Sequence, residues 1–220
     1  MQRPIKFVEL ALVLVVSTAV GVFCKLHWPD SSGWPEVWAF VIGAVAVYLQ
    51  TIEHILSWPT WMLCVAIYAY VFHQASFFAD RDLQVLYFVL SIHGWMSWQK
   101  GKGREEKLKV NRLKPVYWIP VLAAIGLGTA AYYPYLVSAK DAAPFWDGLL
   151  TSGSVVTQVL LNRKVYENWA LWVLIDGIYV PLYIWRGLHA TAILYFVFFL
   201  LAIWGWVAWH RSLREQLQAA

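Results

Sequence analysis

The sequence has few charged residues. Asp, Glu, Lys and Arg together make up 14% of the 220 residues, whereas 60% are hydrophobic and the mean hydropathy is +0.55. An average soluble domain carries about 25% charged residues. This composition excludes an ordinary soluble enzyme or binding domain, and it indicates an integral membrane protein.

Cysteine is scarce and the motifs of soluble enzymes are missing. Cys24 and Cys64 each stand alone in an apolar segment, which excludes a disulfide framework and a cysteine metal site. The chain has no Walker loop, no G-x-G-x-x-G, no H-E-x-x-H and no nucleophile elbow. "KGKGREEKLK" (100 to 109) is interpreted as a solvated connector and not as a phosphate loop. We therefore expect no cofactor, no metal and no use of ATP.

Long apolar runs are what the sequence does have. Each run is about 17 to 23 residues long, enough to cross a bilayer as a helix. Their approximate limits are 5 to 24, 37 to 56, 60 to 79, 82 to 99, 116 to 137, 145 to 162, 169 to 186 and 189 to 210. Barrel strands would alternate over about ten residues, so the runs predict an all-α fold with about eight transmembrane helices. The first run lacks an A-x-A cleavage site, so we expect a helix there and not a signal peptide.

The basic residues predict the orientation. With a cytoplasmic N-terminus, 13 Lys and Arg fall on the inner side, seven of them between residues 100 and 114, and four fall on the outer side. Positive residues favour the cytoplasmic side, so both termini are expected there. The net charge of +4 and the pI near 9.0 are explained in the same way, without nucleic-acid binding.

The sequence contains an internal repeat. A shift of 111 residues aligns 58–100 with 169–211 without a gap, and 13 of the 43 aligned positions are identical. Pairs such as Trp58/Trp169, Trp61/Trp172 and Gly94/Gly205 make chance a poor explanation. The predicted organisation is an N-terminal helix with an outer loop (1–36), a three-helix repeat (37–100), a basic loop with a linking helix (101–143), a second three-helix repeat (144–211) and a tail (212–220). An odd linking helix makes the two repeats parallel, an architecture found in secondary transporters.

Polar residues break the repeat and suggest a site. Polar groups at membrane depth are costly and by default mark a pathway or a binding site. On one face of a helix, "ENWALWVLIDGIY" (167 to 179) places Trp169, Trp172, Asp176 and Tyr179 at steps of three and four residues. Other unmatched polar residues are Gln50, Gln84, His93, Gln158 and Asn168. Asp176 is either a counter-charge for a flat cationic ligand that stacks on the indoles or a carboxylate that fixes helix packing.

The same two interpretations apply elsewhere. His93 is either a ligand or gate residue or a satisfied bundle histidine, and Tyr179 either meets a polar ligand or packs. Gln84 could line an entry route. Six tryptophans near the cytoplasmic ends of their helices are expected to be interfacial anchors; these are Trp58, Trp61, Trp95, Trp98, Trp206 and Trp209.

Five segments of the sequence together resemble the signatures of a known family. They are "WPTW" (58 to 61), "DRDLQ" (80 to 84) and "HGWMSW" (93 to 98) in the first half, and "NWALWVLID" (168 to 176) and "VPLYIWRGLHATAILYFVF" (180 to 198) in the second half. The family that they resemble is the PnuC family of nicotinamide riboside transporters. The resemblance implies a three-one-three fold similar to a full-length SWEET transporter, facilitated diffusion across the bacterial inner membrane, and trapping of the substrate by a cytoplasmic kinase. It implies binding through Asn168, Trp169, Trp172 and Asp176, with Gln84 as a first-half contributor.

The ligand has alternatives. Related branches of the family carry thiamine or riboflavin, and His93 and Ser91 stand where the family commonly has Tyr and Asn. Nicotinamide riboside and thiamine are flat cations that suit tryptophans and an acid, while riboflavin is neutral and larger. Two other classes stay open at this point, a membrane-embedded enzyme with Asp176 and His93 as acid and base, and a binding subunit of an ATP-driven transporter. The sequence leaves open whether the chain forms a homo-oligomer.

Overall fold

The structure is a computed structural model that describes residues 4–28, 33–74, 78–100 and 109–218. In these residues the chain forms eight α-helices and one short 3-10 helix, η1 (Pro115–Tyr117). The α-helices are α1 (Phe7–His27), α2 (Trp34–Thr51), α3 (Ser57–Gln74), α4 (Phe78–Lys100), α5 (Trp118–Ser138), α6 (Pro144–Asn162), α7 (Asn168–Trp185) and α8 (His189–Gln218). Most of the basic loop, residues 101 to 108, lies outside the described residues.

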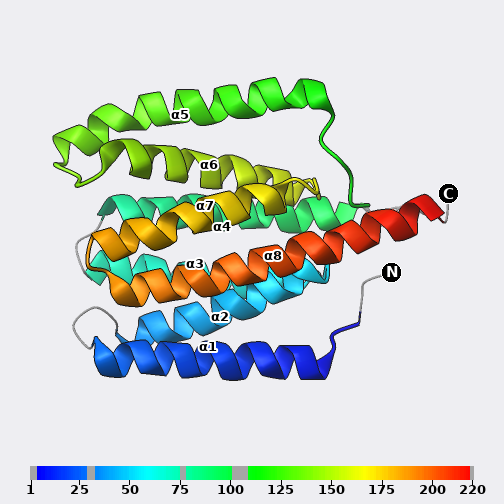
Figure 1. Cartoon of the computed structure of the whole chain (residues 1–220), viewed down its shortest axis with the longest axis horizontal. Helices are drawn as coiled ribbons and strands as arrows, with labels where there is room; N and C mark the ends of the chain where they lie inside the picture. Colours follow the sequence, from blue (N-terminus) through cyan, green and yellow to red (C-terminus); the bar gives the residue numbers. More distant parts are fainter. Residues whose placement is uncertain (1–3, 29–32, 75–77, 101–108, 219–220) are drawn as a thin grey trace.

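All eight helices run along the long axis of the molecule (Figure 1). α1 and α5 form the two outer layers, and the other six helices lie between them. α1 begins and α8 ends at the same end of the bundle, which we call the terminal end; the other end is the loop end (Figure 1). The described chain therefore begins and ends at the same end of the bundle. The side of the membrane that this end faces stays a prediction.

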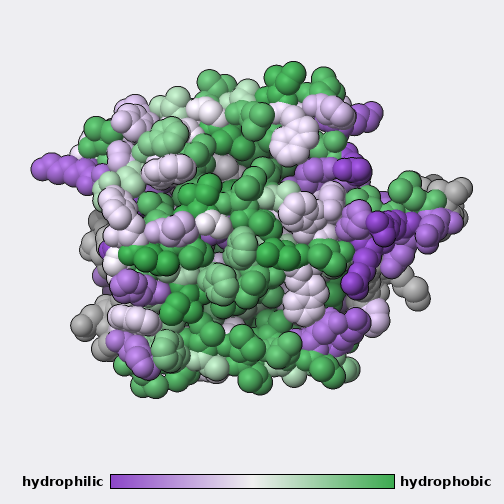
Figure 2. Space-filling model, viewed as in Figure 1, coloured by the Kyte–Doolittle hydropathy of each residue, from purple (hydrophilic) through white to green (hydrophobic). Residues whose placement is uncertain are grey.

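The prediction of an all-α membrane protein with about eight helices is confirmed. Within the described chain, three helical stretches are long and apolar enough to cross a membrane by length and composition, Phe7–His27, Pro115–Ser138 and His189–Gln218. The bundle buries polar residues of the other helices, such as Gln50, Asn162 and Asp176. Hydrophobic side chains cover the middle of the molecule between hydrophilic ends (Figure 2).

Helix bounds differ from the predicted ones at a few places. α2 ends at Thr51, earlier than the predicted limit of 56, and α3 begins at Ser57, earlier than 60. The chain turns between them, where Glu53 has a left-handed φ of 57°. α8 continues to Gln218, so the predicted tail is mostly an extension of this helix.

The repeat covers four helices in each half. The bounds of α1 and α5, and those of α3 and α7, differ by 111 residues, and α2 and α6 end at equivalent residues. α1 packs on α2 as α5 packs on α6, and α2 packs on α8 as α6 packs on α4. The first helix of each predicted triplet therefore contacts the last helix of the other triplet. The halves are related by an approximate two-fold axis, and the N-terminal helix is the counterpart of the linking helix.

Four tryptophans form the core at this axis. Trp58 meets Trp98 edge to face, with ring centroids 5.1 Å apart, and Trp169 meets Trp209 in the same way at 5.6 Å. A Cβ atom at Gly94 would collide with Trp58, and one at Gly205 would come within 2.5 Å of Trp169. The two glycines therefore allow each helix pair to pack closely.

Anchoring at the membrane interface was the wrong expectation for three tryptophans. Trp58 and Trp209 are 0% exposed and Trp98 is 6% exposed. The two-fold arrangement turns these side chains toward the axis and away from lipid. Trp206, at 38% exposed, has the surface position expected of an anchor.

Candidate substrate-binding site

The site is built around Asp176 on α7. Its side chain is buried, with 6% of the residue exposed. Among the described residues it makes no hydrogen bond and no ion pair. Two tyrosines from other helices, Tyr87 of α4 and Tyr195 of α8, lie in the neighbourhood of its carboxyl group. An isolated carboxylate in a low-dielectric interior is costly, so this position favours a cationic partner.

A group of tyrosines extends from Asp176 toward the loop end. Tyr179 and Tyr183, one turn apart on α7, stack with ring centroids 5.3 Å apart. Tyr195 packs against both, at 4.7 Å and 5.0 Å. The three tyrosine residues are only half-buried, so the described residues leave part of their surface uncovered.

Residues of α6 support this group from the second repeat. Ser154 interacts with the Tyr87 hydroxyl, and Thr151 interacts with that of Tyr179. Ser154 is buried at 5% exposure, and its counterpart in the first repeat is Gly43. The second repeat therefore supplies more of the polar groups than the first.

The two tryptophans predicted on α7 have different surroundings. Trp172 is partly buried and packs against the four-tryptophan core. It also packs against an apolar cluster formed by Ala143, Leu150, Ile175 and Leu182. Trp169 is 1% exposed and belongs to the core, under Gly205. Asn168 is 0% exposed, and its Nδ2 donates to the carbonyl of Val165 at 2.6 Å. Its Oδ1 has no hydrogen-bond partner in the part of the chain that the structure describes.

The structure separates two further predicted residues from Asp176. Gln50 is 4% exposed at the terminal end, where its carbonyl accepts a 3.1 Å hydrogen bond from Trp209 Nε1. His93 is exposed on α4, and its Nδ1 lies 3.2 Å from Nδ2 of Asn162. Gln84 is half-buried on α4, three residues from Tyr87 and therefore on the same face of the helix.

Sequence reasoning missed Tyr87, Ser154, Asn162 and Tyr195. Asn162 is 0% exposed and connects α6 to α4, because Nδ2 donates to the carbonyl of Leu90 at 2.8 Å and Oδ1 accepts from Gln158 at 3.2 Å. The alignment of the two repeats contained a signal for both tyrosines, because each is paired with a residue of a different type. Tyr195 aligns with Gln84, and Tyr87 aligns with Phe198.

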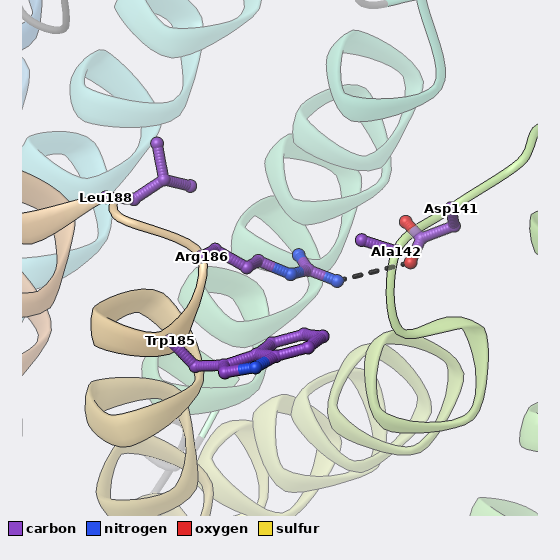
Figure 3. A pocket seen from close by; sticks show the side chains of 5 residues that line it. All are labelled: Asp141, Ala142, Trp185, Arg186 and Leu188. Carbon is purple, nitrogen blue, oxygen red and sulfur yellow. Dashed lines mark hydrogen bonds and ion pairs between the residues drawn. The ribbon is translucent and has the colours of Figure 1, made fainter.

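Positive charge is confined to the ends of the bundle. At the terminal end Lys164 Nζ pairs with Glu53 Oε2 at 2.7 Å. At the loop end Arg186 pairs with Asp141 at 3.2 Å and with Asp147 at 2.7 Å. Figure 3 shows the pair with Asp141 beside Trp185, at a cavity of about 430 Å³. Every described Lys and Arg lies in a loop or toward a helix end, which leaves Asp176 without a cationic side chain.

Comparison with known proteins places these features in a family of transporters. Residues 33–211 match the family described as nicotinamide mononucleotide transporter. The nicotinamide riboside transporter PnuC of Escherichia coli is 28% identical, over 87% of this chain and 93% of its own. PnuC of Neisseria mucosa is 27% identical, over 94% of this chain and 81% of its own. The riboflavin/roseoflavin transporter RibM of Streptomyces davaonensis is 23% identical, over 85% and 91%.

A solved structure has the same fold. A crystal structure of the vitamin B3 transporter PnuC superposes with a TM-score of 0.76 at 24% identity, covering 96% of this chain and 94% of that one. These neighbours are transporters and not enzymes. The family match covers most of the sequence, so the chain is a multi-pass membrane protein that belongs to the nicotinamide mononucleotide transporter family.

Proposed function

We propose that this protein carries nicotinamide riboside across the bacterial inner membrane by facilitated diffusion. The observation that carries the proposal is the buried carboxylate of Asp176, which has no ionic partner among the described residues and has Tyr87 and Tyr195 in its neighbourhood. A pyridinium ring placed there would compensate the charge and pack against Trp172. Tyr87, Tyr179 and Tyr195 would supply hydroxyl groups for the sugar. The names of the relatives support the same substrate.

The site favours the riboside over the mononucleotide named in the family description. A phosphate would add about two negative charges. In the described bundle no Lys or Arg reaches the middle of the helices to pair with it. Asp176 would also repel it, and unpaired charges are costly at this depth.

Alternating access would come from movement of one half against the other. Interactions at the terminal end join the two repeats, through Lys164 and Glu53 and through the indoles of Trp98 and Trp209. The tyrosine group and the Arg186 ion pairs lie toward the loop end. Opening either end in turn would expose Asp176 to one side of the membrane.

The basic loops support a cytoplasmic location of the terminal end. A cytoplasmic kinase that phosphorylates the riboside would then prevent its return, without contacting the transporter. We also propose that Asn168 and Trp169 border the ligand when the terminal end opens, and that Gln84, in the loop-end half of α4, borders it when the loop end opens. Gln50 and His93 would then act in helix contacts more than in ligand binding.

Calorimetry on the purified protein tests the substrate. Nicotinamide riboside, nicotinamide mononucleotide, thiamine and riboflavin are titrated in parallel, and we expect binding of the riboside with little or no binding of the mononucleotide. Tighter binding of thiamine or of neutral riboflavin would refute the assignment. The riboflavin arm is needed because one relative is named for that vitamin.

Flux into proteoliposomes tests the mechanism. Labelled riboside should reach equilibrium across the membrane intact, without ATP and without a proton gradient. Chemical change of the label would indicate an enzyme. Absence of flux by the chain alone would indicate a binding subunit that needs a partner.

A further inference from the structure

The two outer helices, α1 and α5, are equivalent in the repeat but differ in their contacts. α1 packs on α2 and also reaches α8, where Cys24 Sγ lies 3.9 Å from the carbonyl of Ala190. Among the described helices α5 packs only on α6 and its own preceding turn η1, and it makes no contact with α4. Three residues of α5 are buried, Val121, Thr129 and Leu136. One half of the molecule therefore lacks a helix contact that the other half has.

A groove of about 540 Å³ lies at this place, between α4 and α5 with α6 as its floor. Leu83 and Leu86 form the α4 wall, and Ala124 and Gly128 form the α5 wall. The small residues on α5 make the wall concave. Tyr135, which also lines the groove, occupies the position that Cys24 holds in the first half.

The dimensions of the groove match one leaflet of a bilayer. From Ala124 to Tyr135 the wall of α5 extends about 16 Å, at about 1.5 Å per residue. Half of a hydrocarbon core of roughly 30 Å is about 15 Å. The groove extends from Tyr135, near the loop end of α5 at Ser138, past the middle of that helix to Ala124. An acyl chain of a lipid in the loop-end leaflet has the length and the chemistry to fill most of it.

The loop-end rim of the groove carries both signs of charge. Asp82 lines the groove, its side chain is 66% exposed, and Arg81 Nη2 lies 2.6 Å from its Oδ1. Tyr132 and Tyr135 stack beside the rim, with centroids 5.4 Å apart. Paired charges of opposite sign suit a zwitterionic headgroup, and tyrosines are common at the depth of headgroups.

We propose that the groove binds one phospholipid, with an acyl chain between α4 and α5 and a zwitterionic headgroup that carries a primary ammonium at Arg81 and Asp82. The bound chain supplies the contact between α4 and α5 that the polypeptide does not make. The groove does not include Asp176, although Thr151 on its floor also interacts with the Tyr179 hydroxyl. The proposal does not depend on which substrate is carried.

Retention of lipid by the purified full chain is the first test. Native mass spectrometry after a delipidating wash should find about one phospholipid per wild-type chain. Ala124→Trp places an indole in the groove, and this variant should no longer retain the phospholipid. Ala123→Trp is the matched control, because Ala123 is also exposed on α5 but does not line the groove. Equal retention by the wild type and both variants would overturn the proposal, as would loss in both variants.

The thermal midpoint in detergent is the second readout. Added phosphatidylethanolamine should raise it for the wild type and for Ala123→Trp, and should leave Ala124→Trp unchanged, since a ligand stabilises only the protein that binds it. Phosphatidylglycerol should give a smaller rise, and Asp82→Asn should reduce the difference between the two lipids. Retention of free fatty acid alone, or of a second protein chain, would overturn the proposal.

A third measurement covers the case in which Ala124→Trp does not fold. Leu86→Cys can be labelled with a fluorophore selectively, because Cys24 and Cys64 are both buried at 1% exposure. Quenching by a brominated phospholipid should persist when the vesicles are diluted with unbrominated lipid. Loss of quenching at the rate of lipid mixing would indicate ordinary surrounding lipid and would refute a bound one.

Discussion

Glu53 and Lys164 occupy equivalent positions in the two repeats, and their side chains pair with each other at 2.7 Å. Both residues have a left-handed backbone, with φ of 57° and 53°, and each follows the end of the first helix of its triplet. Two equivalent tryptophans also join the halves, because the indole N–H of each donates a hydrogen bond to a backbone carbonyl of the other half. Trp98 Nε1 donates to the carbonyl of Leu161 at 3.3 Å, and Trp209 Nε1 donates to that of Gln50 at 3.1 Å.

Loss of this ion pair should destabilise the protein. After Lys164→Met, the 2.6 Å hydrogen bond from Ser212 is the one polar side-chain contact that Glu53 keeps among the described residues. Because both side chains are mostly buried, at 10% and 14% exposure, we expect a cost of about 2 to 4 kcal/mol in the free energy of unfolding. The measurement is thermal or denaturant unfolding in detergent. Arg112→Met is the control, since Arg112 is 73% exposed in its pair with Glu167 and should change stability little. Similar losses in both variants would contradict the role of burial.

Asp176→Asn should weaken binding of a cation more than binding of its neutral analogue. Loss of a buried charge partner costs about 2 to 5 kcal/mol, so the affinity for nicotinamide riboside should fall at least about 30-fold. The reduced riboside has an uncharged ring and should bind both proteins alike in calorimetry. The exposed carboxylate of Asp82 provides the control substitution Asp82→Asn. An equal loss for both ligands would assign Asp176 to helix packing.

Trp169→Ala and Trp172→Ala should have different effects. Trp169 lies in the core against Trp209 and Gly205, so its truncation should cost about 3 to 5 kcal/mol of stability. Trp172 is partly buried against the apolar cluster that contains Ile175, the neighbour of Asp176 in the sequence. Its truncation should weaken ligand binding by about 1 to 3 kcal/mol through lost stacking and burial. Unfolding and calorimetry on both variants separate these effects. The same pattern in both would contradict the structural distinction.

Alanine at two equivalent glycines should disrupt the tryptophan core. At Gly205 a Cβ would come within 2.5 Å of the Trp169 ring, and at Gly94 it would collide with Trp58. Each substitution should cost about 1 to 3 kcal/mol by overpacking. Gly126→Ala is the control, because a Cβ at Gly126 would meet no atom within 4 Å, and it should stabilise α5 by about 0.5 to 1 kcal/mol. Unfolding midpoints of the three variants provide the comparison.

Stability should decrease in mild acid because of His54. Burial in the turn after α2 lowers the pKa of this imidazole, and its Nδ1 accepts a hydrogen bond from the Leu56 amide at 3.3 Å. The unfolded chain takes up the proton first, near pH 6.5, so stability is complete above that pH and falls as the pH drops below it. His54→Gln should flatten the profile of unfolding midpoint between about pH 5 and pH 7.5. If the unfolding midpoint of His54→Gln depends on pH as steeply as that of the wild type, groups other than His54 cause the pH dependence.

The fold could be predicted to a large extent because two signals agree. Apolar runs give the number of helices, and the tryptophans of the repeat give the register between the halves. The equivalence of α1 and α5 was missed because these outer helices face lipid, where many apolar residues serve equally well and identity is not retained.

The site was less predictable. Asp176 and Trp172 could be found on α7, since a carboxylate in an apolar run is an unambiguous signal. Tyr87 and Tyr195 could not be assigned, because a tyrosine in such a run can face lipid, core or cavity. The two halves pack against each other and bury Trp58, Trp98 and Trp209 between them. The sequence of one helix does not contain the information that predicts this packing.

The opposite charges of Glu53 and Lys164 also determine which halves can associate. Two copies of the first half in this arrangement would set glutamate against glutamate, and two copies of the second half would set lysine against lysine. Each four-helix half therefore selects the other and disfavours itself. A duplicated ancestor whose halves once paired with identical partners would, after this divergence, assemble only as the fused pair.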